Sequence, residues 1–208
     1  MIRAVLFDLG GVVFTSPFDS FARYEHDHGL PEGFIRGLNS TNPDANAWAR
    51  LERAEVSLDE FCTLFEAEAK DAGGELDARD VLALLAGEVR PEMVEAIRRC
   101  RARLKTAALT NNWIPEEDGE RPLRDVTDEL FDVVLESSKI GLRKPDPRIY
   151  ELACEELDIA PPEAVFLDDI GANLKPARAM GMTTIKVTDP SEALAELSKL
   201  LEIPLADD

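Results

Sequence analysis

The sequence AVLFDLGG, residues 4–11, joins a run of four apolar residues to an aspartate and two glycines. A short apolar run of this kind predicts a buried strand, and Asp8 would then stand at its carboxyl end. Gly10 and Gly11, two and three residues after the aspartate, allow backbone amides to approach an anionic ligand closely. The segment favours a strand that presents a carboxylate nucleophile, although an aspartate that only caps a turn would give the same pattern.

Strand and helix patterns alternate along the second half of the chain. Strands are expected at residues 105–109, 131–135, 164–167 and 183–187, and helices at residues 91–103, 147–157, 174–180 and 190–200. This alternation predicts an α/β protein whose core is a doubly wound, Rossmann-like parallel sheet with helices on both faces. In such an architecture, ligands bind beyond the carboxyl ends of the strands.

The segment from residue 17 to residue 87 has a helical pattern and no convincing strand. Ser57 and Glu60 form a capping-box sequence at the start of one expected helix, and a second short helix is expected at residues 77–86. We therefore expect two parts, a core domain of residues 1–16 and 88–208 and an inserted all-helical subdomain of residues 17–87.

The excess of acidic over basic residues limits the classes of binding partner that are expected. The 208 residues include 42 acidic and 23 basic side chains, for a net charge of −19. Such a field repels nucleic acids and membrane surfaces, so neither is an expected partner. It repels anionic substrates as well, so a site for phosphate needs a local cation. The oligomeric state is left open by the sequence.

Cysteine usage predicts a cytoplasmic location. Cys62, Cys100 and Cys154 are odd in number and far apart, which fits neither a disulfide framework nor a zinc site. Asp8 interrupts the only early apolar stretch, so no signal peptide is expected, and no apolar segment approaches the length of a membrane span.

Polar groups follow the predicted strands in order. Asp8 ends the first strand, Thr110-Asn111 the second and Asp168-Asp169 the fourth, while Lys144 follows the third by a short polar segment. Taken singly, these are ordinary turn formers, helix N-terminal charges or a surface lysine. Taken together, they suit phosphoryl transfer. Asp8 and Asp169 would offer hard oxygen ligands to Mg²⁺, Lys144 would offset negative charge, and Thr110 with the Asn111 N–H would hold phosphate oxygens.

These segments resemble the four motifs of the haloacid dehalogenase superfamily, at residues 7–11, 109–112, 141–147 and 166–171. The helical block is similar to the first type of helical cap in that superfamily. The likeness is greatest to the N-terminal phosphatase-like domain of soluble epoxide hydrolases and to a related domain that precedes some acyl-CoA dehydrogenases. It covers nearly the whole chain, and it is specific for the superfamily without specifying a substrate.

The resemblance implies a Mg²⁺-dependent hydrolase that acts on a small phosphorylated metabolite through a covalent intermediate on Asp8. By position, the implied metal ligands are Asp8, the Gly10 carbonyl and Asp169, with Asp168 reaching the ion through water. Thr110, Asn111 and Lys144 are implied to hold the transferring group, and Asn173 to support them. The cap is implied to exclude water and to select the substrate.

Gly10 departs from the pattern of the phosphatases in this superfamily, which carry a second aspartate two residues after the nucleophile. That carboxyl group protonates the leaving group and later activates water. Glycine keeps the carbonyl and loses the acid, and general acid–base catalysis is worth ~10²–10⁴-fold in rate. We therefore expect retained metal binding with weak or restricted phosphatase activity, in which acyl phosphates suffer less than alkyl phosphates.

Two alternatives stay open at this point. A metal-independent dehalogenase would also lack the second aspartate, but the Asp168-Asp169 pair has little purpose without a cation. A non-catalytic module that keeps the fold and the metal would form no covalent adduct on Asp8.

Overall fold

The structure is a computed structural model that describes residues 1–114, 127 and 129–205. Within these residues, five parallel strands form one sheet in the order β3-β2-β1-β4-β5. Each predicted strand is present within two residues of its expected bounds, so the predicted α/β class is confirmed. The strands are β1 (Ala4–Phe7), β2 (Lys105–Thr110), β3 (Val133–Glu136), β4 (Ala164–Asp168) and β5 (Thr183–Lys186).

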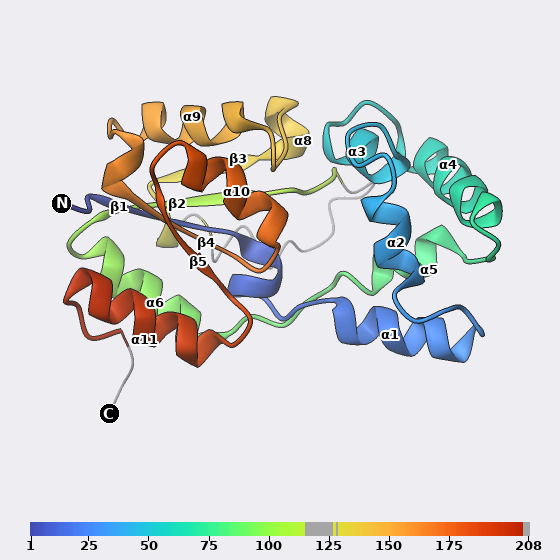
Figure 1. Cartoon of the computed structure of the whole chain (residues 1–208), viewed down its shortest axis with the longest axis horizontal. Helices are drawn as coiled ribbons and strands as arrows, with labels where there is room; N and C mark the ends of the chain where they lie inside the picture. Colours follow the sequence, from blue (N-terminus) through green and yellow to red (C-terminus); the bar gives the residue numbers. More distant parts are fainter. Residues whose placement is uncertain (115–126, 128, 206–208) are drawn as a thin grey trace.

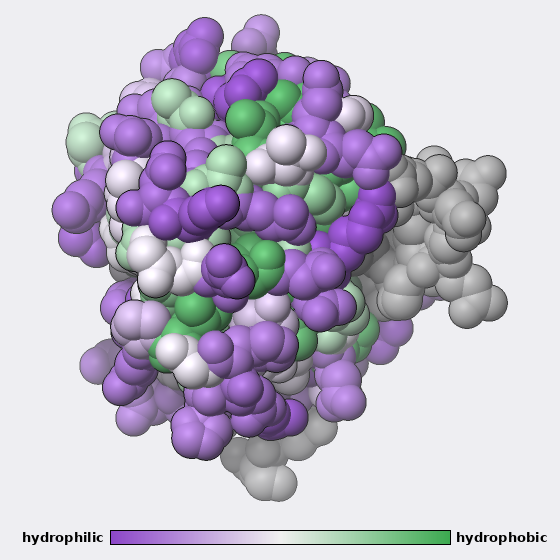
Figure 2. All heavy atoms as spheres, turned by 90° about the vertical axis from the view of Figure 1, so that its right-hand side faces the viewer, coloured by the Kyte–Doolittle hydropathy of each residue, from purple (hydrophilic) through white to green (hydrophobic). Residues whose placement is uncertain are grey.

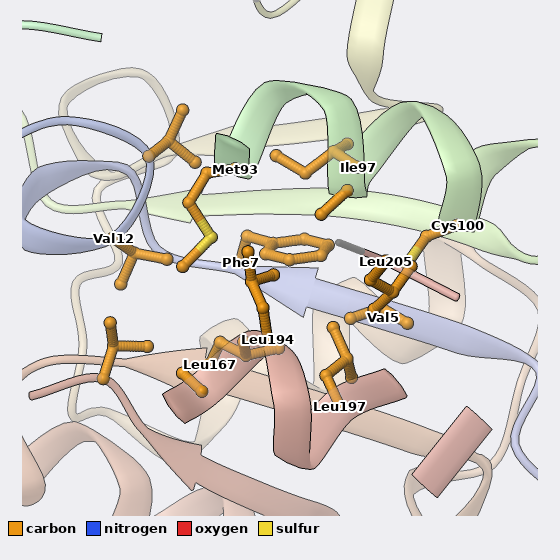
Figure 3. Close-up of a cluster of buried hydrophobic side chains, with 14 of the residues drawn as sticks. Val5, Phe7, Val12, Met93, Ile97, Cys100, Leu167, Leu194, Leu197 and Leu205 are labelled. Carbon is orange, nitrogen blue, oxygen red and sulfur yellow. The ribbon is translucent and has the colours of Figure 1, made fainter. Parts of the chain in front are cut away.

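Helices cover both faces of the sheet, as the alternation of strand and helix predicted (Figure 1). One face packs against α6 (Pro91–Arg101) and α11 (Pro190–Leu201), and the other against α9 (Pro147–Glu156) and α10 (Gly171–Ala179). Because side chains alternate along a strand, Val5 and Phe7 join the first layer while Leu6 joins the second. Figure 3 shows the Phe7 ring between side chains of α6 and α11.

The strand order places β1 at the centre, between β2 and β4, with both neighbours parallel to it. The carboxyl ends of these three strands therefore meet at one edge of the sheet. Asp8 directly follows β1, Thr110 is the last residue of β2, and Asp168 is the last residue of β4. The order of strands reverses beside β1, which is where sheets of this kind open a ligand crevice.

A second group of helices, which we name the helical unit, lies beyond the end of the sheet where η1 (Leu9–Val13) follows β1 (Figure 1). These helices pack around an apolar cluster of their own. The predicted capping box of Ser57 and Glu60 is confirmed at the start of α4. The division of the chain at residues 17 and 87 stays a prediction. The unit consists of α1 (Phe18–Asp27), α2 (Phe34–Ser40), α3 (Ala47–Glu52), α4 (Leu58–Asp71) and α5 (Ala78–Ala83).

The two chain segments that join the helical unit to the sheet run antiparallel, side by side. The Thr15 N–H donates to the Glu88 carbonyl and the Arg90 N–H donates to the Val13 carbonyl, both at 2.9 Å. Phe14 and Val89 form the bridge between them. This pairing ties the entry and exit of the helical unit together next to η1, so the unit is attached beside Asp8.

Two helices differ from their predicted bounds by three residues at one end. Helix α10 begins at Gly171 rather than Leu174, because its first turn is fixed by tertiary contacts of Asp168 and Asn173. Helix α5 ends at Ala83 rather than at residue 86. The remaining short elements are α8 (Ser137–Ile140) and η2 (Pro161–Glu163). The long connection of residues 112–129, between β2 and β3, lies mostly outside the described residues.

Hydrophilic side chains cover most of the face shown in Figure 2, with apolar groups scattered among them. This distribution agrees with the strongly acidic composition. In the described parts of the chain, no helix is long and apolar enough to cross a membrane.

Candidate active site

The Lys144 ammonium lies at the centre of a buried ionic cluster at the carboxyl edge of the sheet. Its Nζ is 2.8 Å from Asp8 Oδ2 and 2.8 Å from Asp168 Oδ2. The Lys144 residue is 1% exposed and Asp168 is 0% exposed. A lysine buried this deeply is held by its charge partners, which excludes the interpretation of Lys144 as an ordinary surface residue.

The Asp168 carboxylate is fully engaged by the protein. Asn173 Nδ2 donates to both of its oxygens at 3.1 and 3.0 Å, and the Ile170 N–H donates to Oδ1 at 2.8 Å. Tyr150 Oη in turn donates to the Asn173 carbonyl at 2.6 Å. Asp168 is therefore fixed in position and holds the Lys144 ammonium, while the supporting role implied for Asn173 stays a prediction.

Asp169 lies next to this cluster, and a glycine gives it room. Oxygens of Asp8, Asp168 and Asp169 all lie within 4.8 Å of one another. Gly11 has a φ of +73°, and a Cβ atom added there would be 2.2 Å from Asp169 Oδ2. Arg90 Nη1 donates to the Gly11 carbonyl at 3.2 Å. The close approach of Asp169 to the backbone after β1 therefore requires glycine at residue 11.

Burial shapes the protonation of the cluster. Desolvation raises the pKa of Asp8 well above its usual value, and Asp168 and Asp169 add to this effect while Lys144 opposes it. Desolvation also raises the pKa of Asp169 to about 6, again with Asp168 adding. Burial by itself would lower the pKa of Lys144, but the Asp168 and Asp8 carboxylates raise it overall. Three carboxyl groups thus share one ammonium, which leaves an excess of negative charge.

This donor set fits a hard divalent cation. Mg²⁺ prefers carboxylate oxygens, and the excess charge of the cluster is what such an ion would neutralise. Because Asp168 is engaged by Asn173 and Ile170, Asp8 and Asp169 are the carboxylates best placed to bind the ion directly. The sequence predicted that Asp8 and Asp169 converge, and their oxygens do lie together.

Asn111 holds the backbone of Lys144. Its Nδ2 donates to the Lys144 carbonyl at 3.0 Å, and the Lys144 N–H donates to its Oδ1 at 2.8 Å. The sequence predicted a phosphate-binding role for the backbone N–H of Asn111, and it gave no signal for these hydrogen bonds of the Asn111 side chain. Thr110 is buried at the end of β2, and its hydroxyl makes no hydrogen bond with any described residue, so it is free to meet a ligand.

Gly10 is exposed and has open space beside it. Its backbone has φ −64° and ψ 132°, which any residue can adopt, and an added Cβ would meet no atom within 4 Å. The acid that phosphatases carry here is therefore absent without any steric reason, because the site has room for a side chain.

The profile of the haloacid dehalogenase-like hydrolases matches residues 2–181, a span that contains the whole cluster. The chain belongs to this family. It is 38% identical over 213 residues to acyl-CoA dehydrogenase family member 10 of Mus musculus and 33% identical over 219 residues to bifunctional epoxide hydrolase 2 of Sus scrofa. Both alignments cover 98% of this chain, but only 19% and 40% of those relatives, respectively. Phosphatase MT3486 of Mycobacterium tuberculosis is 33% identical over 195 residues, with 87% of this chain and 85% of that protein covered.

Several solved structures have the same fold as this chain. A predicted HAD-like family hydrolase from Porphyromonas gingivalis matches with a TM-score of 0.66 and 24% identity, over 97% of this chain and 98% of that one. A HAD family enzyme from Bacteroides thetaiotaomicron, in complex with magnesium and inorganic phosphate, matches with a TM-score of 0.61 and 19% identity, over 92% and 98%. The L-2-haloacid dehalogenase of Xanthobacter autotrophicus matches with a TM-score of 0.61 and 21% identity, over 100% and 85%.

Sequence reasoning missed three charged residues beside the cluster. Arg90 contacts the Gly11 carbonyl, and Arg143 pairs with Glu52 of the helical unit, Nε to Oε2 at 2.6 Å. The one signal for Arg143 was its place directly before Lys144. Glu52 and Arg90 gave no signal, because their partners are far away in sequence.

Replacing Gly11 with alanine should destabilise the protein by about 1–3 kcal/mol, because a Cβ at positive φ would also collide with Asp169. Urea unfolding of Gly11→Ala measures this loss. Gly10→Ala is the matched control and should stay within about 0.5 kcal/mol of the wild type, since its Cβ meets only open space. Equal stability of the two variants would contradict the role given to Gly11.

Asp169→Asn should stabilise the metal-free protein at pH 7.5, by about 1–2 kcal/mol. The pKa of Asp169 is raised to about 6 in the folded state, so the folded protein binds the proton more tightly than the unfolded chain. The free energy of unfolding of the wild type therefore falls as the pH rises from about 4 through 6 and Asp169 ionises. The asparagine variant cannot ionise at this position, so it avoids this loss of stability. Thermal unfolding in EDTA from pH 5 to pH 8 is the measurement. A variant less stable than wild type at pH 7.5 would show that the carboxylate is not strained by excess charge.

Proposed function

We propose that this protein is a Mg²⁺-dependent hydrolase of the phosphatase type, which attacks a small phosphorylated metabolite with the Asp8 carboxylate. The observation that carries the proposal is the position of Lys144 Nζ, 2.8 Å from both Asp8 and Asp168, with Asp169 beside them. An ammonium and an excess of carboxylates at one strand edge provide a nucleophile, a counter-charge and a cation site together.

In this proposal, Asp8 attacks the phosphorus atom and the bond to the leaving group breaks, which gives a phosphorylated aspartate. Water then attacks this phosphorus and releases inorganic phosphate, regenerating the carboxylate. Lys144 attracts the negative charge of the nucleophile and the transferring group, while Asn111 keeps its backbone in place. Thr110, with its free hydroxyl, and the Asn111 N–H hold phosphate oxygens. Mg²⁺, held by Asp8, Asp169 and the Gly10 carbonyl with Asp168 through water, would neutralise further charge and orient the phosphate.

Gly10 restricts the substrates in this proposal. No carboxyl group stands two residues after Asp8 to protonate a departing alkoxide. Leaving groups that need no proton, such as the carboxylate of an acyl phosphate, are therefore turned over faster relative to alkyl phosphates than in a phosphatase that has the acid.

We also propose that residues 17–87 act as a cap over a core of residues 1–16 and 88–208. The position of the helical unit beyond the carboxyl edge supports this division (Figure 1). A cytoplasmic location is part of the proposal, and the three buried, free cysteines are consistent with it. The phosphatase among the relatives and the magnesium and phosphate in the Bacteroides enzyme support the choice of chemistry.

A metal-independent dehalogenase is the second candidate, favoured only by the glycine at residue 10. The three clustered carboxyl groups count against it, because without a metal ion the Lys144 ammonium balances only part of their negative charge. Turnover of 2-haloacids in the presence of a chelator would favour the metal-independent dehalogenase over the phosphatase.

The proposal predicts that the wild-type protein hydrolyses acetyl phosphate with Mg²⁺ and loses this activity in EDTA. Asp8→Asn should abolish turnover, by about 10³-fold or more, since an amide cannot form the covalent intermediate. Phosphate release measures both effects, and a Mg²⁺-dependent beryllofluoride adduct on Asp8 is a second readout. Full activity of Asp8→Asn would refute the nucleophile, and the absence of both adduct and turnover would favour a non-catalytic module.

Gly10→Asp should raise kcat for an alkyl phosphate such as glycerol phosphate by ~10²-fold, because it restores the missing acid in a space that is open. The gain for acetyl phosphate should be much smaller. Gly10→Asn fills the same space without the acid and serves as the control. Equal gains for the two variants, or equal gains for the two substrates, would contradict the explanation.

A further inference from the structure

Arg143 joins the helical unit to the segment that carries Lys144. Its Nε donates to Glu52 Oε2 at 2.6 Å, and its Nη1 donates to the Pro43 carbonyl at 2.8 Å. Glu52 is the last residue of α3 and Pro43 lies in the loop before that helix. One guanidinium group therefore holds both ends of the same piece of the helical unit.

This ion pair is largely removed from water. The Arg143 and Glu52 side chains are only 17% and 15% exposed. Burial raises the pKa of Glu52 even though Arg143 and Lys144 oppose the rise, so the carboxylate is both desolvated and close to the lysine of the cluster. Removing one partner of such a pair leaves a buried charge without compensation, which is strongly unfavourable.

A second contact of α3 reaches the neighbouring segment of the site. Trp48 on α3 packs against Trp113, with ring centroids 6.5 Å apart and planes at 73°. Trp113 follows the segment Thr110-Asn111-Asn112 that ends β2. Helix α3 also packs against α8 of the sheet side. Its two ends thus touch the segments that carry the groups proposed to hold phosphate.

Those two segments are themselves linked. The side chain of Asn111 makes two hydrogen bonds with the backbone of Lys144, and Lys144 Nζ contacts Asp8. A continuous chain of contacts therefore runs from α3 through Arg143 and Trp113 to the Lys144 ammonium and the proposed nucleophile.

We propose that Arg143 is a positioning residue for Lys144, which docks α3 of the helical unit beside the Asp8 edge and thereby fixes the lysine that neutralises the transferring group. This inference rests on the proposed function. Arg143 itself does not touch the reacting atoms. It acts through the backbone bond to Lys144, so a shift of about 1 Å at α3 is passed to the ammonium, and such a misplacement can cost ~10²-fold in rate.

The chain offers a matched control. Arg53 Nε donates to Glu55 Oε1 at 2.6 Å, and its Nη2 donates to the Asp44 carbonyl at 3.1 Å. Arg53 therefore makes the same kinds of bond as Arg143, at similar distances, but all its partners lie at residues 44–55. Arg53→Met removes an arginine whose hydrogen bonds stay within the helical unit and whose effect on Glu52 and on Asp146 of the sheet side is through charge alone.

The test compares Arg143→Met, Glu52→Gln and Arg53→Met. The chain has two tryptophans, Trp48 and Trp113, one on each side of the boundary, so near-UV circular dichroism of tryptophan reports the docking of α3 directly. The second readout is kcat and KM for p-nitrophenyl phosphate with Mg²⁺, a substrate whose leaving group needs little protonation.

Arg143→Met and Glu52→Gln should each weaken the coupled tryptophan signal and lower kcat/KM by about 10- to 100-fold, and the double variant should lose little more. Arg143→Lys, which keeps the positive charge, should recover part of the tryptophan signal and part of kcat/KM. Arg53→Met should stay within about twofold of wild type.

An unchanged tryptophan spectrum in Arg143→Met, or an equal loss of kcat/KM in Arg53→Met, would overturn the positioning role. If the spectrum changes in Arg143→Met but the wild type hydrolyses no phosphate compound, the docking by Arg143 is upheld and the proposed function fails. If the wild type is active and the spectrum changes while kcat/KM does not, Arg143 docks α3 without positioning Lys144, and the inference fails alone.

Discussion

A single ammonium, Lys144 Nζ, is shared between carboxylates that follow two different strands, and the architecture of the site depends on this sharing. Ionised carboxylates repel one another, so burying several of them together requires protonation or a cation held among them. The parallel sheet makes that possible, because β1 and β4 end side by side and deliver Asp8 and Asp168 to one point. One ammonium does not balance three carboxyl groups, and this imbalance supports the proposal that the cluster binds a divalent cation.

Gly10 and Gly11 are adjacent in sequence but are under different structural constraints. Gly11 is required by the fold, since its positive φ and the contact with Asp169 leave no room for a Cβ. Gly10 has an ordinary backbone conformation and empty space around it, so no packing constraint selects it. In the proposed function its effect is chemical, because residue 10 then supplies no carboxyl group to protonate the leaving group. The space left beside Gly10 is the feature of the site most closely tied to the proposed choice of leaving group.

The helical unit is connected to this chemistry through specific contacts. The paired segments at Thr15–Glu88 and Val13–Arg90 attach it next to η1, and Arg90 also reaches the Gly11 carbonyl. On the other side, Arg143 and Trp113 meet α3. The helical unit therefore borders the cluster through residues directly adjacent in sequence to Gly10, Asn112 and Lys144. Such an arrangement lets a change in the helical unit reach the ionic cluster through only one or two bonds.

The positions of the strands, the α/β class and the convergence of Asp8, Lys144, Asp168 and Asp169 at one edge of the sheet could all be predicted from the sequence, because apolar runs report burial and strand ends of a parallel sheet share one edge. The fixed first turn of α10, the bonds of Asn111 to Lys144 and the pairing of Arg143 with Glu52 could not. Glu52 and Arg143 are separated by 91 positions in the chain, and no local pattern records which distant side chain will neutralise a charge. Local sequence thus determined which residues are buried and where strands end, because those properties depend on neighbours along the chain. Only the tertiary structure decided which charges compensate one another, since that depends on distances in space between segments the sequence keeps apart.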